Sequence, residues 1–191
     1  TGLIEVSQPM DLLDLGAVFS SLPLPKGNKV AIVTLGGGWG VITTDLCIEN
    51  KLVIPELPAN IISRINKWLP PYWSQANPID IVGEINPEIP KKIMAELLKW
   101  EECEAVIHLG IHGNQVMGEK MLDSVSQVDR SYSVEQISQL KKYLFDIEKD
   151  YLEYIIRLMQ EYEKPVVGVS IMTDQNSKII YRTDNSKYQG V

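Results

Sequence analysis

The fold is decided by residues 29–40, which read Lys-Val-Ala-Ile-Val-Thr-Leu-Gly-Gly-Gly-Trp-Gly. From Val30 to Thr34 the side chains are apolar or β-branched without interruption, a pattern typical of a strand buried on both faces of a parallel sheet. Four glycines follow within five residues, and residues 41–49 then have the composition of a helix that stops near Asn50. This order of strand, glycine-rich turn and helix predicts the first half of a βαβ unit.

The alternation of strand and helix patterns continues on both sides of this stretch. An N-terminal helix is predicted from Ser7 and Pro9 up to the first proline of a linker, Pro23. Short apolar runs predict strands at 52–57, 77–83, 105–111 and 165–171 and an edge strand at 178–181, and apolar side chains at helical spacing predict helices at 61–69, 86–97 and 133–158. The polar residues 115–131 predict an excursion from the core. Strands alternating with helices favour right-handed crossovers and a parallel sheet, so the predicted fold class is doubly wound α/β.

Composition and charge exclude several classes of protein. The chain has 191 residues, of which 45% are apolar and 23% charged, and its formal net charge is -7. This length suits one well-buried core. The acidic balance argues against a broad basic face for nucleic acid or an anionic membrane, and the apolar runs are too short to span a bilayer. We therefore expect a soluble protein with no nucleic-acid or membrane partner.

The cysteines and the chain ends bear on the compartment and on completeness. Cys47 and Cys103 are far apart and form no CxxC pair, so we interpret both as buried small hydrophobic side chains in a reducing cytoplasm. The start has neither a basic nor an apolar leader segment, so no signal peptide is expected. The chain begins without Met and stops abruptly at Val191, and we interpret both ends as fragment boundaries.

Candidate ligand-contacting residues follow the predicted strands. In doubly wound folds ligands bind outside the carboxyl ends of the strands. Three strand ends in the sequence carry glycines, amides, carboxylates or histidines at that position. The candidates for phosphate or anion binding, or for an interface, are Thr34, Gly36, Gly37, Gly38, Gly40, Asn77, Asp80, Gly110, His112 and Gly113.

The glycine-rich turn at 36–40 has two readings of equal weight. Glycine lets the backbone approach a ligand closely, and the N-terminus of the following helix attracts an anion such as phosphate or carboxylate. Alternatively, the glycines serve only the packing of a tight turn. Val41 occupies the position where the dinucleotide fingerprint needs a small residue, and no Lys-Ser/Thr pair follows as in a P-loop.

The other two strand ends likewise allow a structural and a functional interpretation. Asn77 and Asp80 flank a proline, where such residues more often make local turn hydrogen bonds than contact a ligand. His108 falls inside a predicted strand and is interpreted as a hydrogen-bonded core residue, whereas His112 at the strand end is better placed for function. No metal-ligand spacing surrounds the histidines, and no catalytic signature is present, so we expect no metal site and no catalytic residue in this chain.

Residues 25–41, with Thr44-Asp45 behind them, resemble a conserved-looking block of ADP-forming acetyl-CoA and acyl-CoA synthetases, members of the succinyl-CoA synthetase superfamily. The block in that family reads GN-x-VAI-(V/I)-T-N-x-GG-x-G-V...D. Leu69-Pro70-Pro71 and the run Asn77 to Ile81 are similar to the family's next landmarks, and residues 181–191 resemble the entry to its closing segment. Leu35 and Trp39 depart from the Asn and Pro that the family often carries.

The resemblance implies a flavodoxin-like domain, an α/β/α sandwich, at 29–191, truncated at its C-terminus and preceded at 1–28 by a helix and linker from another domain. It also implies a cytoplasmic nucleotide-dependent ligase that interconverts acid, CoA and ATP with acyl-CoA, ADP and phosphate. The phosphohistidine would lie outside this chain, so the fragment alone would be inactive. It would bind no cofactor itself, while the full-length enzyme would use CoA, ATP or ADP, and Mg. Its partners would be a CoA-binding domain and an ATP-grasp domain or subunit, with a homodimer left open.

Two other functions remain open from the sequence. One is a non-catalytic regulatory or assembly domain, as in protein acetyltransferases that carry a similar region. The other is a free-standing flavodoxin-like nucleotide binder, which the arrangement of the aromatic residues does not favour. The acyl substrate and the nucleotide are not predicted.

Overall fold

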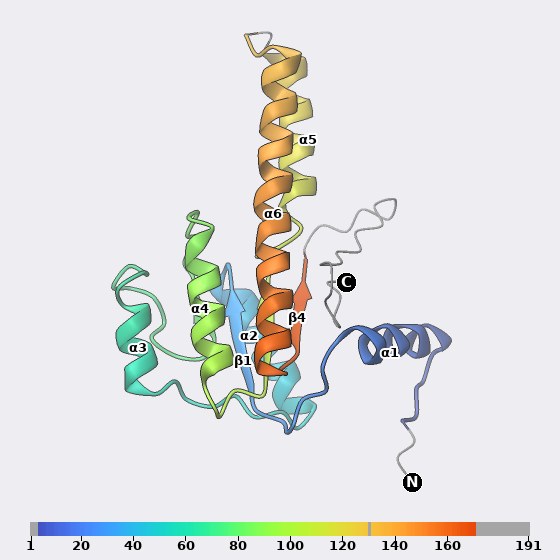
Figure 1. Cartoon of the computed structure of the whole chain (residues 1–191), viewed down its shortest axis with the longest axis vertical. Coiled ribbons are helices and arrows are strands. Elements are labelled where there is room, and N and C mark those ends of the chain that lie inside the picture. The colour runs from blue at the N-terminus through green and yellow to red at the C-terminus, as the bar shows by residue number, and fades with distance from the viewer. Residues whose placement is uncertain (1–3, 130, 171–191) are drawn as a thin grey trace.

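The computed structural model describes residues 4–129 and 131–170. Helices and strands alternate along most of this range (Figure 1). Their bounds are α1 Pro9–Ser21, β1 Val30–Thr34, α2 Gly37–Glu49, α3 Ala59–Ile65, β2 Ile79–Asp80, α4 Glu88–Lys99, β3 Ala105–Leu109, α5 Asn114–Val128, α6 Val134–Tyr162 and β4 Val166–Val169. The predicted edge strand at 178–181 and the motif at 181–191 lie outside the described residues.

The described strands form one parallel sheet in the order β2-β1-β3-β4. From β1 the chain moves to one side to form β2 and then crosses to the other side for β3 and β4, which is the doubly wound arrangement. The register places Thr34 beside both Asp80 and Leu109. The predicted α/β fold with a parallel sheet is therefore confirmed, and the carboxyl ends of β1, β2 and β3 meet at one edge.

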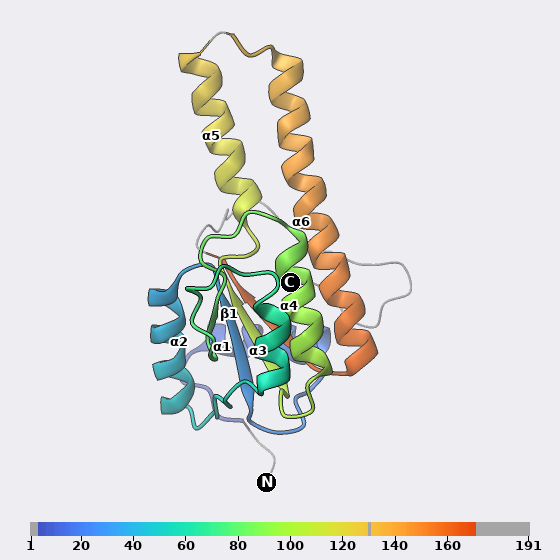
Figure 2. The ribbon, with the colours of Figure 1, turned by 90° about the vertical axis from the view of Figure 1, so that its left-hand side faces the viewer.

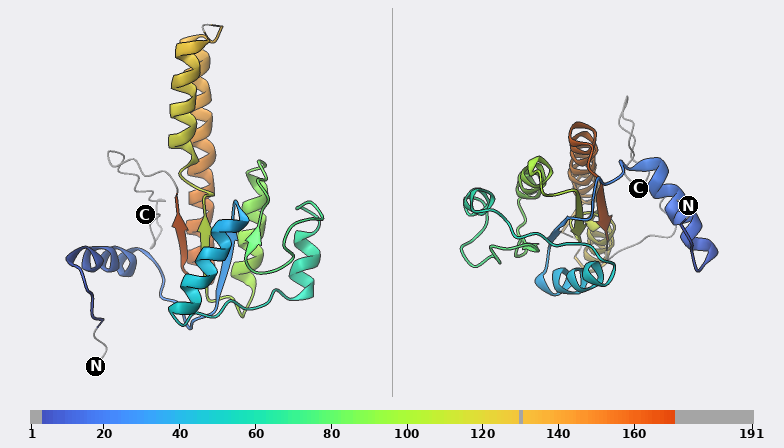
Figure 3. Two further views of the ribbon diagram at one scale, coloured as in Figure 1. Left: turned by 180° about the vertical axis from the view of Figure 1, so that it is seen from behind. Right: turned by 90° about the horizontal axis from the view of Figure 1, so that it is seen from below.

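Helices cover both faces of the sheet. The side chains of Ala31 and Val33 point to the face covered by α3, α4 and α6, whereas Val30 and Ile32 point toward α2. Figure 3, seen from below, shows α2 on one side of the strands and α3, α4 and α6 on the other. β1 is buried along its whole length, because two layers shield it and a strand neighbours each of its edges. Both cysteines are buried and unpaired, as predicted.

The strand predicted at 52–57 is wrong. Only Val53 pairs with β1, through an isolated bridge to Lys29, because Pro55 has no N–H to donate to a ladder. Farther along β1, the side chain of Asn77 takes over the pairing. Its Oδ1 accepts from the amide of Ile32 at 2.9 Å, and its Nδ2 donates to the carbonyls of Val30 and Pro55 at 3.0 and 3.1 Å. A side-chain amide thus fills the gap between the bridge at Val53 and strand β2.

The polar residues 115–131 lie outside the core, as predicted, but most of them are helical. They form α5, which has no buried residue and packs along α6 with Gly118 against the side chain of Leu144. Figure 2 shows the two helices projecting together beyond the sheet. α6 is a single helix of 29 residues whose first turn has the predicted capping box between Ser133 and Gln136.

Candidate functional site

The glycine-rich turn after β1 is shorter than the sequence suggested, because α2 already begins at Gly37. Gly36 is the N-cap residue, with extended backbone. The buried Thr34 holds this turn, since its hydroxyl donates to the carbonyl of Gly36 at 2.7 Å and accepts from the amide of Gly36 at 3.2 Å. The predicted loop is therefore one cap residue followed by the first turn of a helix, where the first amides have no acceptor within the helix.

Asp80 brings its own negative charge to the start of α2. Its Oδ1 accepts from the amide of Val82 at 2.8 Å, a local turn bond of the kind the sequence favoured. A Cβ built on Gly37 would lie only 2.9 Å from Oδ2 of Asp80, so the carboxylate lies against the first turn of the helix. A carboxylate is favourable at this positive end. An anionic ligand would have to share the helix end with it.

The glycines of this edge differ in what surrounds them. A Cβ on Gly40 would meet the Thr34 methyl at 3.0 Å and the Pro78 Cβ at 3.1 Å, whereas a Cβ on Gly36 or Gly38 would meet nothing within 4 Å beyond the neighbouring residues. Gly40 therefore lets α2 pack closely on β1. Gly36 and Gly38 have open space around them and are free to meet a ligand or another domain.

The third strand end combines a turn and a helix start. β3 ends at Leu109, two residues earlier than predicted, because Gly110 turns the chain with a φ of 72°. The indole of Trp39 packs on Gly110, where a Cβ would lie 2.9 Å from Cζ3. Gly113, also at positive φ, is the N-cap of α5. The structure thus brings the three strand ends to one edge of the sheet, but the side chain of Asn77 pairs with the middle of β1 instead.

A paired substitution separates packing from contact at this edge. We expect Gly40→Val to lower the free energy of unfolding by about 2 kcal/mol, because the added side chain overlaps β1. We expect Gly38→Ala to raise it by roughly 0.5 kcal/mol through helix propensity. Urea denaturation measures both. Equal effects of the two substitutions would contradict the assignment of Gly40 as the packing residue.

The two histidines face each other beneath this edge. Their ring centroids are 4.8 Å apart, and Nδ1 of His108 lies 3.3 Å from the Tyr151 hydroxyl oxygen of α6. The sequence reading of His108 as a hydrogen-bonded core residue is confirmed. Burial lowers the pKa of His108 to about 3 and raises that of Tyr151 well above its usual value. Both groups are therefore neutral at pH 7.

One ring nitrogen of His112 has no hydrogen-bond partner among the described residues. This atom, Nδ1, is buried. Burial lowers the pKa of His112, while the nearby carboxylate of Glu148 opposes that shift. Glu148 is itself buried and accepts from the amide of Gln115 at 3.0 Å, at the start of α5. The histidines are thus part of a polar cluster at the base of the helical hairpin.

Sequence reasoning missed Glu148. It lies three residues before Tyr151, which the sequence placed in the apolar stripe of α6, so both share one helix face. A carboxylate on an apolar face is the signal that would have identified it.

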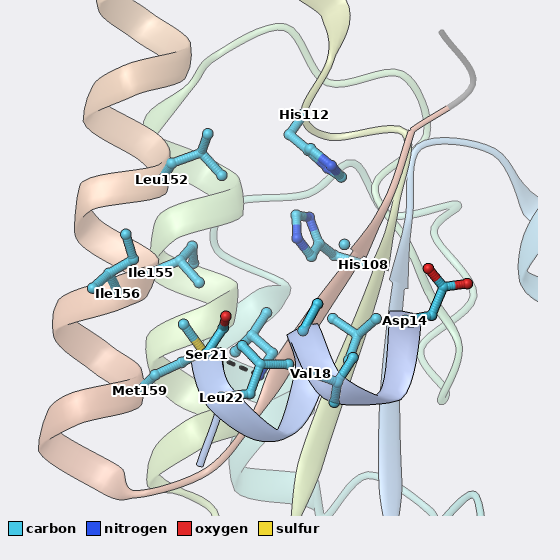
Figure 4. A pocket seen from close by; sticks show the side chains of 14 residues that line it. Asp14, Val18, Ser21, Leu22, His108, His112, Leu152, Ile155, Ile156 and Met159 are labelled. Carbon is cyan, nitrogen blue, oxygen red and sulfur yellow. Dashed lines mark hydrogen bonds between the residues drawn. The ribbon is translucent and has the colours of Figure 1, made fainter. Parts of the chain in front are cut away.

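Two cavities adjoin this cluster. One, of about 500 Å³, lies between α1, α6 and β4 and is lined by both histidines (Figure 4). The other, of about 520 Å³, is lined by Glu148, Tyr151 and the loop after β2. Among residues 4–129 and 131–170, no group of three or more His, Cys, Asp or Glu residues could hold a metal ion. The same residues contain no helix long and apolar enough to cross a membrane.

Comparison with known proteins gives consistent matches. Residues 30–121 match the family described as Ligase-CoA domain. The chain is 26% identical over 140 residues to 4-hydroxybutyrate–CoA ligase (ADP-forming) of Nitrosopumilus maritimus, covering 73% of this chain and 20% of that protein. It is 33% identical over 88 residues to the alpha subunit of acetate–CoA ligase (ADP-forming) II of Pyrococcus furiosus, covering 46% and 19%. The chain thus spans about a fifth of the length of these curated relatives.

Solved structures agree on the fold. A crystal structure of a protein from Pyrococcus horikoshii matches with a TM-score of 0.63 and 23% identity, over 90% of this chain and 33% of that one. A dinucleotide-forming acetyl-coenzyme A synthetase of Candidatus Korarchaeum cryptofilum, in complex with phosphate and ADP, matches with a TM-score of 0.53 and 20% identity, over 82% and 40%. Residues 30–121 therefore match the family described as Ligase-CoA domain, and the chain is similar to ADP-forming acid–CoA ligases.

Proposed function

We propose that this chain is part of an ADP-forming acid–CoA ligase, which interconverts acid, CoA and ATP with acyl-CoA, ADP and phosphate. The observation that carries the proposal is the Ligase-CoA match over 30–121. That range includes β1, the turn into α2, β2 and the start of α5, and so all three strand ends that carry the candidate residues.

The proposed role of this domain is to support a reaction whose covalent step takes place elsewhere. A histidine outside this chain would carry the phosphoryl group between the acyl-CoA site and the nucleotide site. Both histidines of the chain are buried or half-buried beneath the sheet edge, and burial lowers the pKa of each. Neither is exposed as a phosphoryl carrier must be. CoA, ATP or ADP and Mg would be bound by the full-length enzyme.

The carboxyl edge of the sheet is the proposed contact with the rest of the enzyme. A side chain on Gly36 or Gly38 would meet open space, and the carboxylate of Asp80 lies against the first turn of α2. These features suit the approach of a phosphoryl-carrying loop or of a CoA-binding domain. An ATP-grasp domain or subunit would complete the enzyme. Two buried, unpaired cysteines suit the proposed cytoplasmic location.

The test is phosphoryl labelling of the full-length parent protein beside this chain. Both are incubated with radiolabelled ATP and Mg²⁺ and then chased with CoA and a panel of carboxylic acids. We expect an acid-labile, base-stable label on the parent alone, discharged on the chase with formation of acyl-CoA. A parent that never labels and makes no acyl-CoA would instead favour the regulatory domain.

A variant control locates the phosphohistidine. The parent is also prepared with His108→Gln and His112→Gln, which remove every histidine of this chain. We expect this double variant to label as the wild type does. If circular dichroism shows it folded and the label is lost, the assignment of the carrier histidine to another segment is wrong.

A further inference from the structure

The cavity between α1, α6 and β4 has no role in the proposed function. Its volume of about 500 Å³ lies in the range of pockets that hold small organic ligands. Most of its wall is aliphatic, formed by Val18, Leu152, Ile155, Ile156, Met159 and Val166. Such a wall favours an apolar body.

Besides Asp14 and Ser21, the polar side chains of this wall are the two imidazoles. His108 is only 3% exposed, and among the described residues its side chain makes one hydrogen bond, between Nδ1 and the Tyr151 hydroxyl. That bond leaves Nε2 of His108 available, and Nδ1 of His112 is buried without a hydrogen-bond partner among the described residues. Burying a polar atom without a partner is unfavourable, so native proteins seldom keep one such as Nδ1 of His112. A ligand with a polar end would give both nitrogens a partner.

The surroundings of His108 determine which atom faces the ligand. Gly168 of β4 lines the cavity, and a Cβ there would lie 2.5 Å from both Nε2 of His108 and Cε1 of His112. Gly168 therefore leaves room for both rings. A tyrosine hydroxyl that donates to Nδ1 of His108 leaves the proton on Nε2, which then donates into the cavity. Glu148 lies on the other side of the cluster and lines the second cavity.

We propose that this cavity binds a monocarboxylic acid with a bulky apolar body. The carboxylate accepts from Nε2 of His108, and the aliphatic or aromatic part packs between α1 and α6 (Figure 4). The choice of an acid over another hydrogen-bond acceptor rests on the proposed function, because that reaction consumes carboxylic acids. The size and the apolar wall of the cavity select a larger acid over acetate.

Nuclear magnetic resonance of the imidazoles tests the proposal in this chain. Both histidines of the chain line the cavity, so both pairs of imidazole ¹⁵N signals report on it. Hexanoate is titrated beside hexan-1-ol, which lacks the carboxylate, and acetate, which lacks the body. We expect saturable shifts with hexanoate and at least about tenfold weaker binding of the other two, since a charge-assisted hydrogen bond or several buried methylenes are lost.

Substitutions on α1 localise the binding. Ala17 is exposed on this helix and lines the cavity, so Ala17→Trp fills the space without disturbing the core. We expect it to weaken hexanoate binding at least about tenfold. The matched control is Leu12→Trp, at a position of the same helix that is 63% exposed and does not line the cavity. It should bind as the wild type does.

Three results would overturn the proposal: equal binding of hexan-1-ol and hexanoate, unaltered binding by Ala17→Trp, or a ¹⁵N shift that places the proton of His108 on Nδ1. The outcome is separable from that of the proposed function. If the chain binds hexanoate and the parent forms no acyl-CoA, the site stands and the ligase fails. If the parent is a ligase and neither histidine responds to hexanoate, the ligase stands and this site fails.

Discussion

Asn77→Ala is expected to lower the free energy of unfolding by roughly 3 kcal/mol. The side chain makes three hydrogen bonds to backbone groups, two of them in β1 at Val30 and Ile32. Both residues are buried, so water cannot replace the lost amide. Each bond contributes about 1 kcal/mol, so the loss of all three accounts for a change of roughly 3 kcal/mol. Urea denaturation of the chain measures the change.

The control for this prediction is Asn50→Ala. Asn50 is exposed, and its Nδ2 donates to the carbonyl of Leu46 in the last turn of α2. Water can take over this bond, so we expect a change of no more than about 0.5 kcal/mol. If Asn77→Ala lowers the free energy of unfolding no more than Asn50→Ala does, the hydrogen bonds of the Asn77 side chain do not stabilise this part of the sheet.

The second large effect is a loss of stability in mild acid. The folded pKa of His108 is about 3, and that of an unfolded histidine is about 6.5. Between these values the unfolded chain binds more protons than the folded chain, so stability is complete above pH 6.5 and falls with decreasing pH. The slope for one histidine approaches about 1.4 kcal/mol per pH unit. We expect His108 alone to remove about 2 kcal/mol between pH 6.5 and 5, with His112 adding to the loss.

Variants lacking the imidazoles test the cause. Urea denaturation at pH 7, 6 and 5 is compared for the wild type, His108→Gln and the double variant with His112→Gln. Glutamine does not titrate. We therefore expect the dependence of the free energy of unfolding on pH to weaken in the single variant and nearly to disappear in the double one. The slope is the measured quantity, and it stays informative even if glutamine lowers stability at every pH. An unchanged slope in the double variant would show that other groups cause the acid sensitivity.

The strand–turn–helix stretch was predictable because its evidence is local. The apolar run at 30–34 predicts a strand buried on both faces, and this prediction does not depend on the rest of the chain. The capping box at Ser133 and Gln136 likewise depends on residues three apart. The turn after β1 was predicted too long, because glycines that signal a loop also tolerate the first turn of a helix when β1 and β2 pack against it.

The strand predicted at residues 52–57 shows where local sequence evidence fails. Residues 52–57 have strand composition, but Pro55 breaks the ladder and Asn77, 45 residues after Ile32, completes it. Residues 115–131 have few apolar positions, yet they are helical because α6 supplies the surface on which α5 packs. In both segments tertiary contacts outweighed local propensity.

The amino-acid sequence by itself determined the α/β class, the buried first strand, the alternation of elements and the set of strand ends that carry the candidate residues. Periodicity, caps and turn residues express these features within a few positions of each other. Only the tertiary structure decided that His108 meets Tyr151, 43 residues away, that Gln115 meets Glu148, and that a cavity opens beside them. Those contacts depend on how α6 packs against the sheet, and packing brings together residues that no local pattern connects.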